Sequence, residues 1–255
     1  MLIELPFVLP ERTAKPRENG VTMVMDKGLS IREAEDMIQT AGHLIDFIKL
    51  GFGTSLFTNN LKEKIKFYQQ NNLKVYVGGT LFEAFVIRNK FDEYRKFIKE
   101  LNINTVEVSD GSMEMIHDKK CEYIRILAAE NTVISEVGSK DASVNIAPDA
   151  WAAMMQKELQ AGAVKVIAEA RESGTVGIYD PKGNADVALI NKILEKISVE
   201  KIIWEAPLKS QQVWFIKHFG TNINLGNIAP NEVIALETLR MGLRGDTFHQ
   251  FLSLK

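Results

Sequence analysis

Short apolar segments alternate with longer amphipathic segments along this chain of 255 residues. Apolar runs of four to seven residues are typical of buried strands, whereas apolar residues recurring every three or four positions indicate helices that pack on one face. The pattern predicts strands at 21–25, 44–50, 74–77, 105–109, 132–137, 163–168, 201–204 and 221–225. It predicts helices at 30–41, 61–70, 91–101, 116–129, 148–161, 186–197, 210–219 and 230–243.

This alternation indicates a closed barrel of eight parallel strands with an outer layer of helices, a (β/α)8 or TIM barrel. Each strand–helix unit is about 25 to 35 residues, which suits a helical crossover between parallel strands. We expect one domain over residues 1–255, with residues 1–20 as an irregular, proline-containing N-terminal segment. A doubly wound open sheet is the alternative. It is disfavoured because no Gly-x-Gly-x-x-Gly turn follows a predicted strand.

Charged or amide side chains follow nearly every predicted strand. Because the carboxyl ends of barrel strands meet at one face, these side chains are expected to converge there. Asp26, Lys49 and Glu83 are at or after the ends of the first three predicted strands, and Asn224 and Asn227 are at the end of the eighth. The four glutamates of strands four to seven are candidate Mg²⁺ ligands, because Mg²⁺ prefers carboxylate oxygens: Glu107, Glu136, Glu169 and Glu205. The alternative is that some of them only pair with lysine or arginine.

Cations on the same face are candidate anion-binding groups: Lys27, Lys49, Lys140 and Arg171. The planar guanidinium of Arg171 suits an oxyanion pair best. Small loops add hydroxyl and main-chain N–H groups that can cradle an anion; their candidate residues are Ser55, Ser173, Gly174 and Asn227. The alternative role for the cations is charge balance against the glutamates.

Composition narrows the function classes. The net charge of −2 and the pI near 6.2 give no overall basic field for nucleic acid or an anionic membrane surface. The only cysteine, Cys121, excludes an internal disulfide and is expected to pack in a helix. No secretory signal or membrane-spanning apolar run is evident, so we expect a cytoplasmic protein. None of the four histidines follows a predicted strand, which argues against a histidine-based zinc or triad site.

Two further segments are expected to serve stability or assembly. Residues 12–20 precede the first strand, at the end of the barrel opposite the predicted site. Arg240 and Arg244, four positions apart on the last predicted helix, are expected to form surface or interface ion pairs. A homo-oligomer is expected, with the last helix and the N-terminal segment as contact surfaces.

Several separated motifs, taken in order, resemble the phosphosulfolactate synthase family. They are Leu9-Pro-Glu-Arg-Thr-Ala-Lys-Pro-Arg17, Asp26-Lys-Gly28, Lys49-Leu-Gly-Phe-Gly-Thr-Ser55, Gly78-Gly-Thr80, Ala170-Arg-Glu-Ser-Gly174 and Leu239-Arg-Met-Gly-Leu-Arg-Gly-Asp-Thr247. The resemblance covers essentially the whole chain. It implies a Mg²⁺-dependent barrel that adds sulfite to phosphoenolpyruvate and gives (2R)-phospho-3-sulfolactate, a step toward coenzyme M in methanogens.

The implied chemistry matches the residues at the predicted site. Three anionic groups must meet there: a phosphate, a carboxylate and sulfite. A divalent cation and lysines stabilise the charge that develops on the carboxylate, and a general acid then protonates C2. We expect Lys140 or Lys49 to be that acid, and Arg171 and Lys27 to hold phosphate and sulfite.

Two other functions remain open from the sequence. One is a Schiff-base aldolase with Lys49, Lys140 or Lys165 as the nucleophile. The other is a barrel that binds a phosphorylated metabolite without catalysis.

Overall fold

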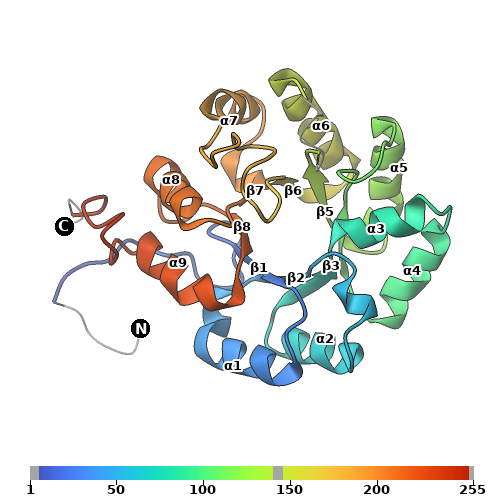
Figure 1. The fold of residues 1–255 in the computed structure, drawn as a ribbon, viewed down its shortest axis with the longest axis horizontal. Helices are drawn as coiled ribbons and strands as arrows, with labels where there is room; N and C mark the ends of the chain where they lie inside the picture. Colours follow the sequence, from blue (N-terminus) through green and yellow to red (C-terminus); the bar gives the residue numbers. More distant parts are fainter. Residues whose placement is uncertain (1–5, 140–145, 253–255) are drawn as a thin grey trace.

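The structure, a computed structural model, describes residues 6–139 and 146–252. Its centre is a sheet of eight parallel strands, and helices surround this sheet as a ring (Figure 1). The strands are β1 (Thr22–Asp26), β2 (Phe47–Leu50), β3 (Lys74–Val77), β4 (Thr105–Val108), β5 (Thr132–Val137), β6 (Ala163–Ala168), β7 (Ile202–Glu205) and β8 (Leu225–Ile228). The architecture confirms the predicted (β/α)8 barrel.

Helices follow the strands in alternation. They are α1 (Ile31–Ala41), α2 (Leu61–Gln70), α3 (Gly79–Val86), α4 (Phe91–Glu100), α5 (His117–Ala128), α6 (Pro148–Ala161), α7 (Val187–Leu194), α8 (Lys209–Phe219) and α9 (Val233–Arg240). Four short 3-10 helices, η1 (Gly42–Leu44), η2 (Thr54–Leu56), η3 (Val199–Lys201) and η4 (Pro230–Glu232), lie in the connections. No helix in the described ranges is both long enough and apolar enough to cross a membrane.

The strands follow the order β3-β2-β1-β8-β7-β6-β5-β4 around the barrel. Strands β3 and β4 contact each other at the seam, where the main-chain N–H of Gly79 donates to Glu107 Oε1 at 2.6 Å. A site residue therefore helps to join the two edges of the sheet.

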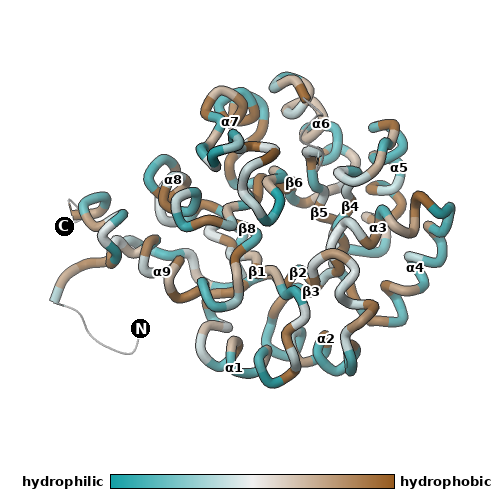
Figure 2. The backbone as a smooth tube through the Cα atoms, in the orientation of Figure 1, coloured by the Kyte–Doolittle hydropathy of each residue, from teal (hydrophilic) through white to brown (hydrophobic). Residues whose placement is uncertain are grey.

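Local sequence signals explain several element boundaries. Ser30 caps α1 in a reciprocal capping box with Glu33, as predicted. Helix α6 starts at Pro148 and ends before Gly162, whose φ of +119° suits glycine. Figure 2 shows hydrophobic and hydrophilic residues interleaved along the helices, as one-sided packing requires.

Apolar side chains fill two separate regions. One lies inside the barrel and consists of Val21, Met23, Phe47, Tyr76, Ile134, Ile167 and Ile203. The other lies between the barrel and its helices and contains most of the buried aliphatic residues. The interior cluster lies beneath the charged side chains at the strand ends. The polar groups therefore rest on a close-packed apolar layer.

One predicted strand is wrong in position, and one helix was not predicted. Strand eight was expected at 221–225, but β8 spans Leu225–Ile228, and Asn224 lies before it, accepting from Val21 N–H and donating to the carbonyls of Glu200 and Ile202. The alternation of Ile223 and Leu225 resembles a strand, which explains the error. Glu83 does not end a strand but lies in α3, a helix hidden by its start on two glycines.

Arg240 was expected to form an ion pair at the surface; it does lie 4.0 Å from Glu237, but it is buried. Its side chain is fully buried at the bottom of the barrel, where Nη1 donates to the carbonyls of Thr221 (2.6 Å) and Ile223 (2.7 Å). Nη2 donates to the carbonyl of Val21 at 3.3 Å. A guanidinium has five N–H donors and can satisfy several carbonyls at once, so its role here is to hold chain segments together.

The segment before β1 is also held at this end of the barrel. Arg12 pairs with Glu237 of α9 at 2.9 Å, and Arg17 pairs with Asp46 at 3.1 Å. The partners, Glu237 and Asp46, are distant in sequence from this segment. These contacts support the predicted stabilising role of residues 12–20.

Candidate active site

The carboxyl ends of the strands open into a cavity of about 520 Å³. Its lining combines two cations, two carboxylates, hydroxyl groups and an amide. The lining residues are Met25, Lys49, Phe52, Thr80, Ser112, Arg171, Glu172, Ser173, Glu205 and Asn227. We call this cavity the mouth. It lies at the end of a parallel barrel where active sites are found.

Three glutamates converge beside the mouth, and one of them, Glu205, lines it. Glu136 ends β5, Glu205 ends β7, and Glu169 directly follows β6. One carboxylate oxygen from each lies within 4.8 Å of the others, and all three side chains are buried. Opposite corners of a Mg²⁺ octahedron are about 4.1 Å apart, so a small closure of the three side chains would let them share one such ion.

Lys49 of β2 points into the same group of carboxylates. Its Nζ lies 3.0 Å from Glu107 Oε2 and 3.1 Å from Glu136 Oε2. The distance from Nζ to Glu205 Oε1 is 3.5 Å. Burial alone would lower the pKa of the ammonium, but the three carboxylates together raise this pKa well above its ordinary value. Lys49 is therefore a fixed cation inside the barrel.

Glu107 differs from the other three candidate metal ligands. Its Oε1 accepts the Gly79 N–H across the barrel seam, and its Oε2 contacts Lys49. It does not belong to the close group formed by Glu136, Glu169 and Glu205. Burial raises the pKa of the Glu107 carboxyl to about 7, although Lys49 opposes that rise. These contacts indicate that Glu107 positions the Lys49 ammonium and links β4 to the start of α3 at the barrel seam.

Main-chain N–H groups orient two members of the group of three. Arg171 N–H donates to Glu169 Oε1 at 2.6 Å, and Ala170 N–H donates to Glu205 Oε2 at 3.1 Å. Arg171 adopts a left-handed conformation, with φ of +56°, that turns the chain directly after β6. This tight turn brings the Arg171 side chain to the mouth while its backbone fixes Glu169.

A buried lysine behind the site was not predicted. Lys120 of α5 is fully buried, and its Nζ donates to the main-chain carbonyl of Glu136 at 2.6 Å. It also pairs with Asp110 at 2.7 Å and with Glu158 at 2.9 Å. The sequence held a signal for this position: Lys120 precedes Ile124 by four and Leu127 by seven residues, so it lies on the apolar face of its helix.

The predicted substrate-binding residues divide into two sets. Arg171, Ser173 and Asn227 line the mouth. The other three do not belong to its lining: Lys27 pairs with Glu172 at the exposed rim, Ser55 is buried, and the carbonyl of Gly174 accepts from Gln211 Nε2. Gly174 therefore anchors its loop to α8.

The lysines expected to do chemistry also separate. Lys140 lies outside the described residues, just after Ser139 in the connection from β5. Lys165, a nucleophile candidate for the aldolase alternative, lies near the start of β6, and its Nζ donates to the carbonyls of Glu18 and Glu200. That is the opposite end of the barrel from the mouth, so Lys165 is wrong as a catalytic residue.

Sequence reasoning did not single out five residues that line the mouth. Phe52, Thr80 and Glu172 were noted only within the family motifs, and Met25 and Ser112 were not considered as site residues. Thr80 follows β3 and Ser112 follows β4, so their positions after strands were the available signal. The mouth thus joins oxygen donors for a divalent cation to fixed cations and hydroxyls, an arrangement suited to binding a small substrate with several negative charges.

Solved structures share the fold at low sequence identity. A 3-hexulose-6-phosphate synthase from Salmonella typhimurium superposes with a TM-score of 0.54 at 15% identity, covering 88% of this chain and all of that one. A fungal endo-beta-N-acetylglucosaminidase of glycosyl hydrolase family 18 gives 0.57 at 11% identity, covering 86% of this chain and 98% of that one. These matches support the barrel architecture.

Sequence comparisons are more specific. The family profile described as (2R)-phospho-3-sulfolactate synthase (ComA) matches residues 10–246. A phosphosulfolactate synthase from Methanothermobacter thermautotrophicus is 43% identical, covering 94% of this chain and 96% of that protein. Phosphosulfolactate synthases from Bacillus subtilis (94% of this chain, 96% of that protein) and Methanocaldococcus jannaschii (91% and 94%) are 41% and 42% identical. The chain therefore belongs to the (2R)-phospho-3-sulfolactate synthase family of enzymes.

Proposed function

We propose that this protein adds sulfite to phosphoenolpyruvate in a Mg²⁺-dependent reaction that yields (2R)-phospho-3-sulfolactate. One observation carries the proposal: in a member of this family, Lys49 and Arg171 line the mouth, and Lys49 pairs with two members of a cluster of three carboxylates. The substrates bring a phosphate, a carboxylate and sulfite. Such a set of anions needs both a dication and fixed positive side chains.

The group of Glu136, Glu169 and Glu205 fits Mg²⁺, because hard oxygen ligands suit this ion. We assign the metal to these three residues, and we leave Glu107 out because it lies outside their close group and its Oε1 accepts the Gly79 N–H across the seam. A bound Mg²⁺ would act as a Lewis acid toward the negative charge that develops on the substrate carboxylate.

The remaining roles follow from position. Arg171 offers a planar pair of donors for the phosphate at the mouth, and Ser173 and Asn227 offer further polar groups there. When the sulfur lone pair forms a bond to C3, the C2=C3 electrons move toward the carboxylate. Lys49, fixed by its glutamate neighbours, supplies positive charge beside that carboxylate.

A proton must then reach C2 to complete the product. We assign this step to Lys140, because Lys49 is held among Glu107, Glu136 and Glu205 and is less able to approach C2. Lys140 follows Glu136 by four residues in the sequence and comes three residues after the end of β5.

The test is an assay of protein, phosphoenolpyruvate, sulfite and Mg²⁺ that follows the loss of enol absorbance and identifies the product by mass. We expect consumption only when all four components are present, and loss of consumption with EDTA. Phosphoenolpyruvate consumption without sulfite, or undiminished turnover after metal removal, would contradict the proposal. Trapping of a substrate adduct by borohydride would instead favour the Schiff-base alternative.

The Lys140 assignment has its own control. Lys140→Met is expected to abolish turnover, whereas Lys27→Met, at the exposed rim, retains most of it. Unchanged turnover in Lys140→Met would remove this residue from the mechanism without affecting the overall reaction.

A further inference from the structure

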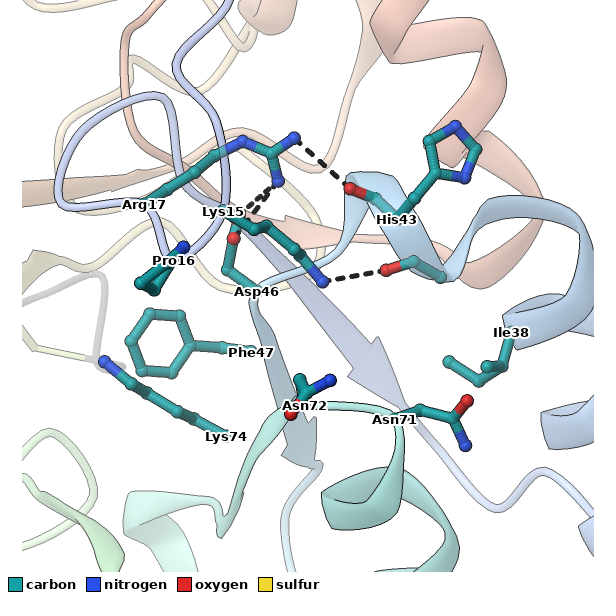
Figure 3. Close-up of a pocket in the computed structure, with 11 residues that line it drawn as sticks. Lys15, Pro16, Arg17, Ile38, His43, Asp46, Phe47, Asn71, Asn72 and Lys74 are labelled. Atoms are coloured by element: carbon teal, nitrogen blue, oxygen red, sulfur yellow. Dashed lines mark hydrogen bonds and ion pairs between the residues drawn. The ribbon is translucent and has the colours of Figure 1, made fainter. Parts of the chain in front are cut away.

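A second cavity of about 510 Å³ lies at the opposite end of the barrel from the mouth. It is bounded by the segment before β1, by α1 and η1, by the start of β2 and by the turn before β3 (Figure 3). We call it the lower cavity. Its lining residues are Lys15, Pro16, Arg17, Ile38, Gly42, His43, Asp46, Phe47, Asn71, Asn72 and Lys74.

The lining of the lower cavity carries excess positive charge. Its single carboxylate, Asp46, is already engaged: Oδ1 pairs with Arg17 Nη1 at 3.1 Å, and Oδ2 accepts the Thr22 N–H at 2.9 Å. The pair formed by Arg17 and Asp46 is close to neutral and nearly buried. Lys15 and Lys74 therefore remain as two positive charges facing the same space.

Lys15 has spare donors at this cavity. Its Nζ donates to the Gly42 carbonyl at 2.9 Å, and an ammonium has three N–H bonds. Burial lowers the pKa of Lys15, and the attraction of Asp46 only partly opposes this. An anion in the cavity would supply the opposite charge that the half-buried ammonium lacks, because across the described ranges no carboxylate lies within 4.0 Å of it.

Lys74 reaches the cavity from the first residue of β3. Its Nζ lies 5.2 Å from the centre of the Phe47 ring, a cation–π contact, and no ion pair joins it to a carboxylate of residues 6–139 or 146–252. Figure 3 shows Lys15 and Lys74 entering from different segments, with Pro16 and Phe47 between them. Two ammonium groups thus flank an apolar surface.

The rest of the lining suits the body of an organic ligand. Pro16, Ile38 and Phe47 form apolar surface, and the exposed Asn71 and Asn72 add amide groups. Cavities of about 300 to 1,000 Å³ that combine apolar walls with a few polar anchors are typical of metabolite sites. The volume of the lower cavity, about 510 Å³, falls within this range.

We propose that the lower cavity binds an organic phosphate of about the size of a nucleoside monophosphate. Its phosphate pairs with Lys15 at one end of this apolar surface, its ring system rests on Pro16 and Phe47, and Lys74 donates a hydrogen bond to it at the other end. Occupation ties the segment before β1 to β2 and β3, so the ligand stabilises the folded chain. This site is separate from the mouth, and the proposal does not depend on the reaction proposed above.

The test is calorimetric titration of the wild-type protein with adenosine 5′-monophosphate at about 150 mM salt, where exposed charges are screened. We expect one ligand per chain. Lys74→Met and Lys15→Met should each weaken binding about tenfold or more, because a hydrogen bond to a charged group contributes that much. Lys74 is exposed, so its replacement leaves folding intact even if Lys15→Met does not.

Arg171→Met, at the mouth, is the matched control and should bind the nucleotide as tightly as the wild type does. Binding that is lost in Arg171→Met but retained in Lys74→Met would place the nucleotide at the mouth and overturn the proposal, as would the absence of binding at millimolar concentration. Titration with inorganic phosphate tests whether the apolar surface of Pro16 and Phe47 contributes to the affinity. Phosphate is expected to bind more weakly, and equal affinity would overturn the organic part of the proposal.

Discussion

Lys120 Nζ donates a 2.6 Å hydrogen bond to the main-chain carbonyl of Glu136. The same ammonium pairs with Asp110 and with Glu158, and His117 Nε2 lies 3.0 Å from Glu158 Oε1. Helix α5 is thereby fastened to the end of β5, at the residue whose carboxylate pairs with Lys49 and belongs to the group of three. The position of a candidate metal ligand depends on a side chain that never reaches the site.

Replacement of Lys120 by Met should therefore affect both stability and activity. Removing the ammonium leaves the buried Glu158 with His117 as its remaining partner and deprives the largely buried Asp110 of its cation, and loss of one partner of a buried pair costs about 3–5 kcal/mol. Urea unfolding should show this loss, and turnover should fall because Glu136 is no longer fixed. Lys119→Met, one residue earlier and exposed, is the control and should change the unfolding free energy by less than about 0.5 kcal/mol.

The four buried glutamates should respond differently to replacement. Glu169→Gln and Glu205→Gln each remove a negative oxygen ligand from the group of three. Loss of a residue that hydrogen-bonds to a metal ligand typically lowers metal affinity roughly 10- to 100-fold. We expect a larger fall in Mg²⁺ affinity here, because a ligand itself is changed. Titration of activity against Mg²⁺ measures this change, with the exposed Glu122→Gln as a control.

Glu107→Gln should lower turnover while leaving the Mg²⁺ dependence nearly unchanged, because Glu107 contacts Lys49 and Gly79. A shift in Mg²⁺ affinity as large as that of Glu169→Gln would show that Glu107 is also a metal ligand.

Arg240 and Arg244 form a matched pair for a stability test. Arg240→Met deprives the carbonyls of Thr221, Ile223 and Val21 of a donor, and an unsatisfied buried polar group costs about 1–3 kcal/mol. The urea midpoint should fall clearly in Arg240→Met and stay nearly constant in Arg244→Met, whose side chain is partly exposed. Equal midpoints for the two variants would contradict this assignment. Turnover of folded Arg240→Met should be unchanged, since the residue lies far from the mouth.

Most of the fold was predictable because apolar runs and helical spacing report burial directly. The strands β3 and β5 match the prediction at both ends. Helix α3 was hidden because glycines at positions 78 and 79 resemble a loop, although tertiary packing makes a helix there. Strand β8 was misplaced because Ile223 lies before it with the same apolar spacing.

The convergence of Glu136, Glu169 and Glu205 was predictable for a different reason. In a parallel barrel, residues at the ends of neighbouring strands must share one face. Pairing between side chains is not encoded by such a rule. The sequence allowed cations to pair with the glutamates as an alternative, but it could not show that Lys49 is the one that does. Nor could it show that Arg240 binds the Val21 carbonyl, because both contacts join residues far apart in the chain.

Cys121 gives a stability test that depends on pH. Its side chain is buried in α5, and burial raises the pKa of the thiol. The unfolded thiol has a pKa of about 8.5, so between that value and the raised folded value the native state binds more protons than the unfolded state. The stabilising contribution of Cys121 is thus fully present at neutral pH and declines as pH rises through this window.

We expect Cys121→Ala to be less stable than the wild type by about 1 kcal/mol near neutral pH, as is usual for a small buried truncation. That difference should narrow at about pH 9.5, because only the wild type must keep a thiol protonated in order to stay folded. Urea unfolding of both proteins at the two pH values, with a reducing agent present, measures the difference, and contributions from all other groups cancel in the comparison. A difference that widens with pH would mean that the folded protein favours the thiolate, contrary to the burial of Cys121.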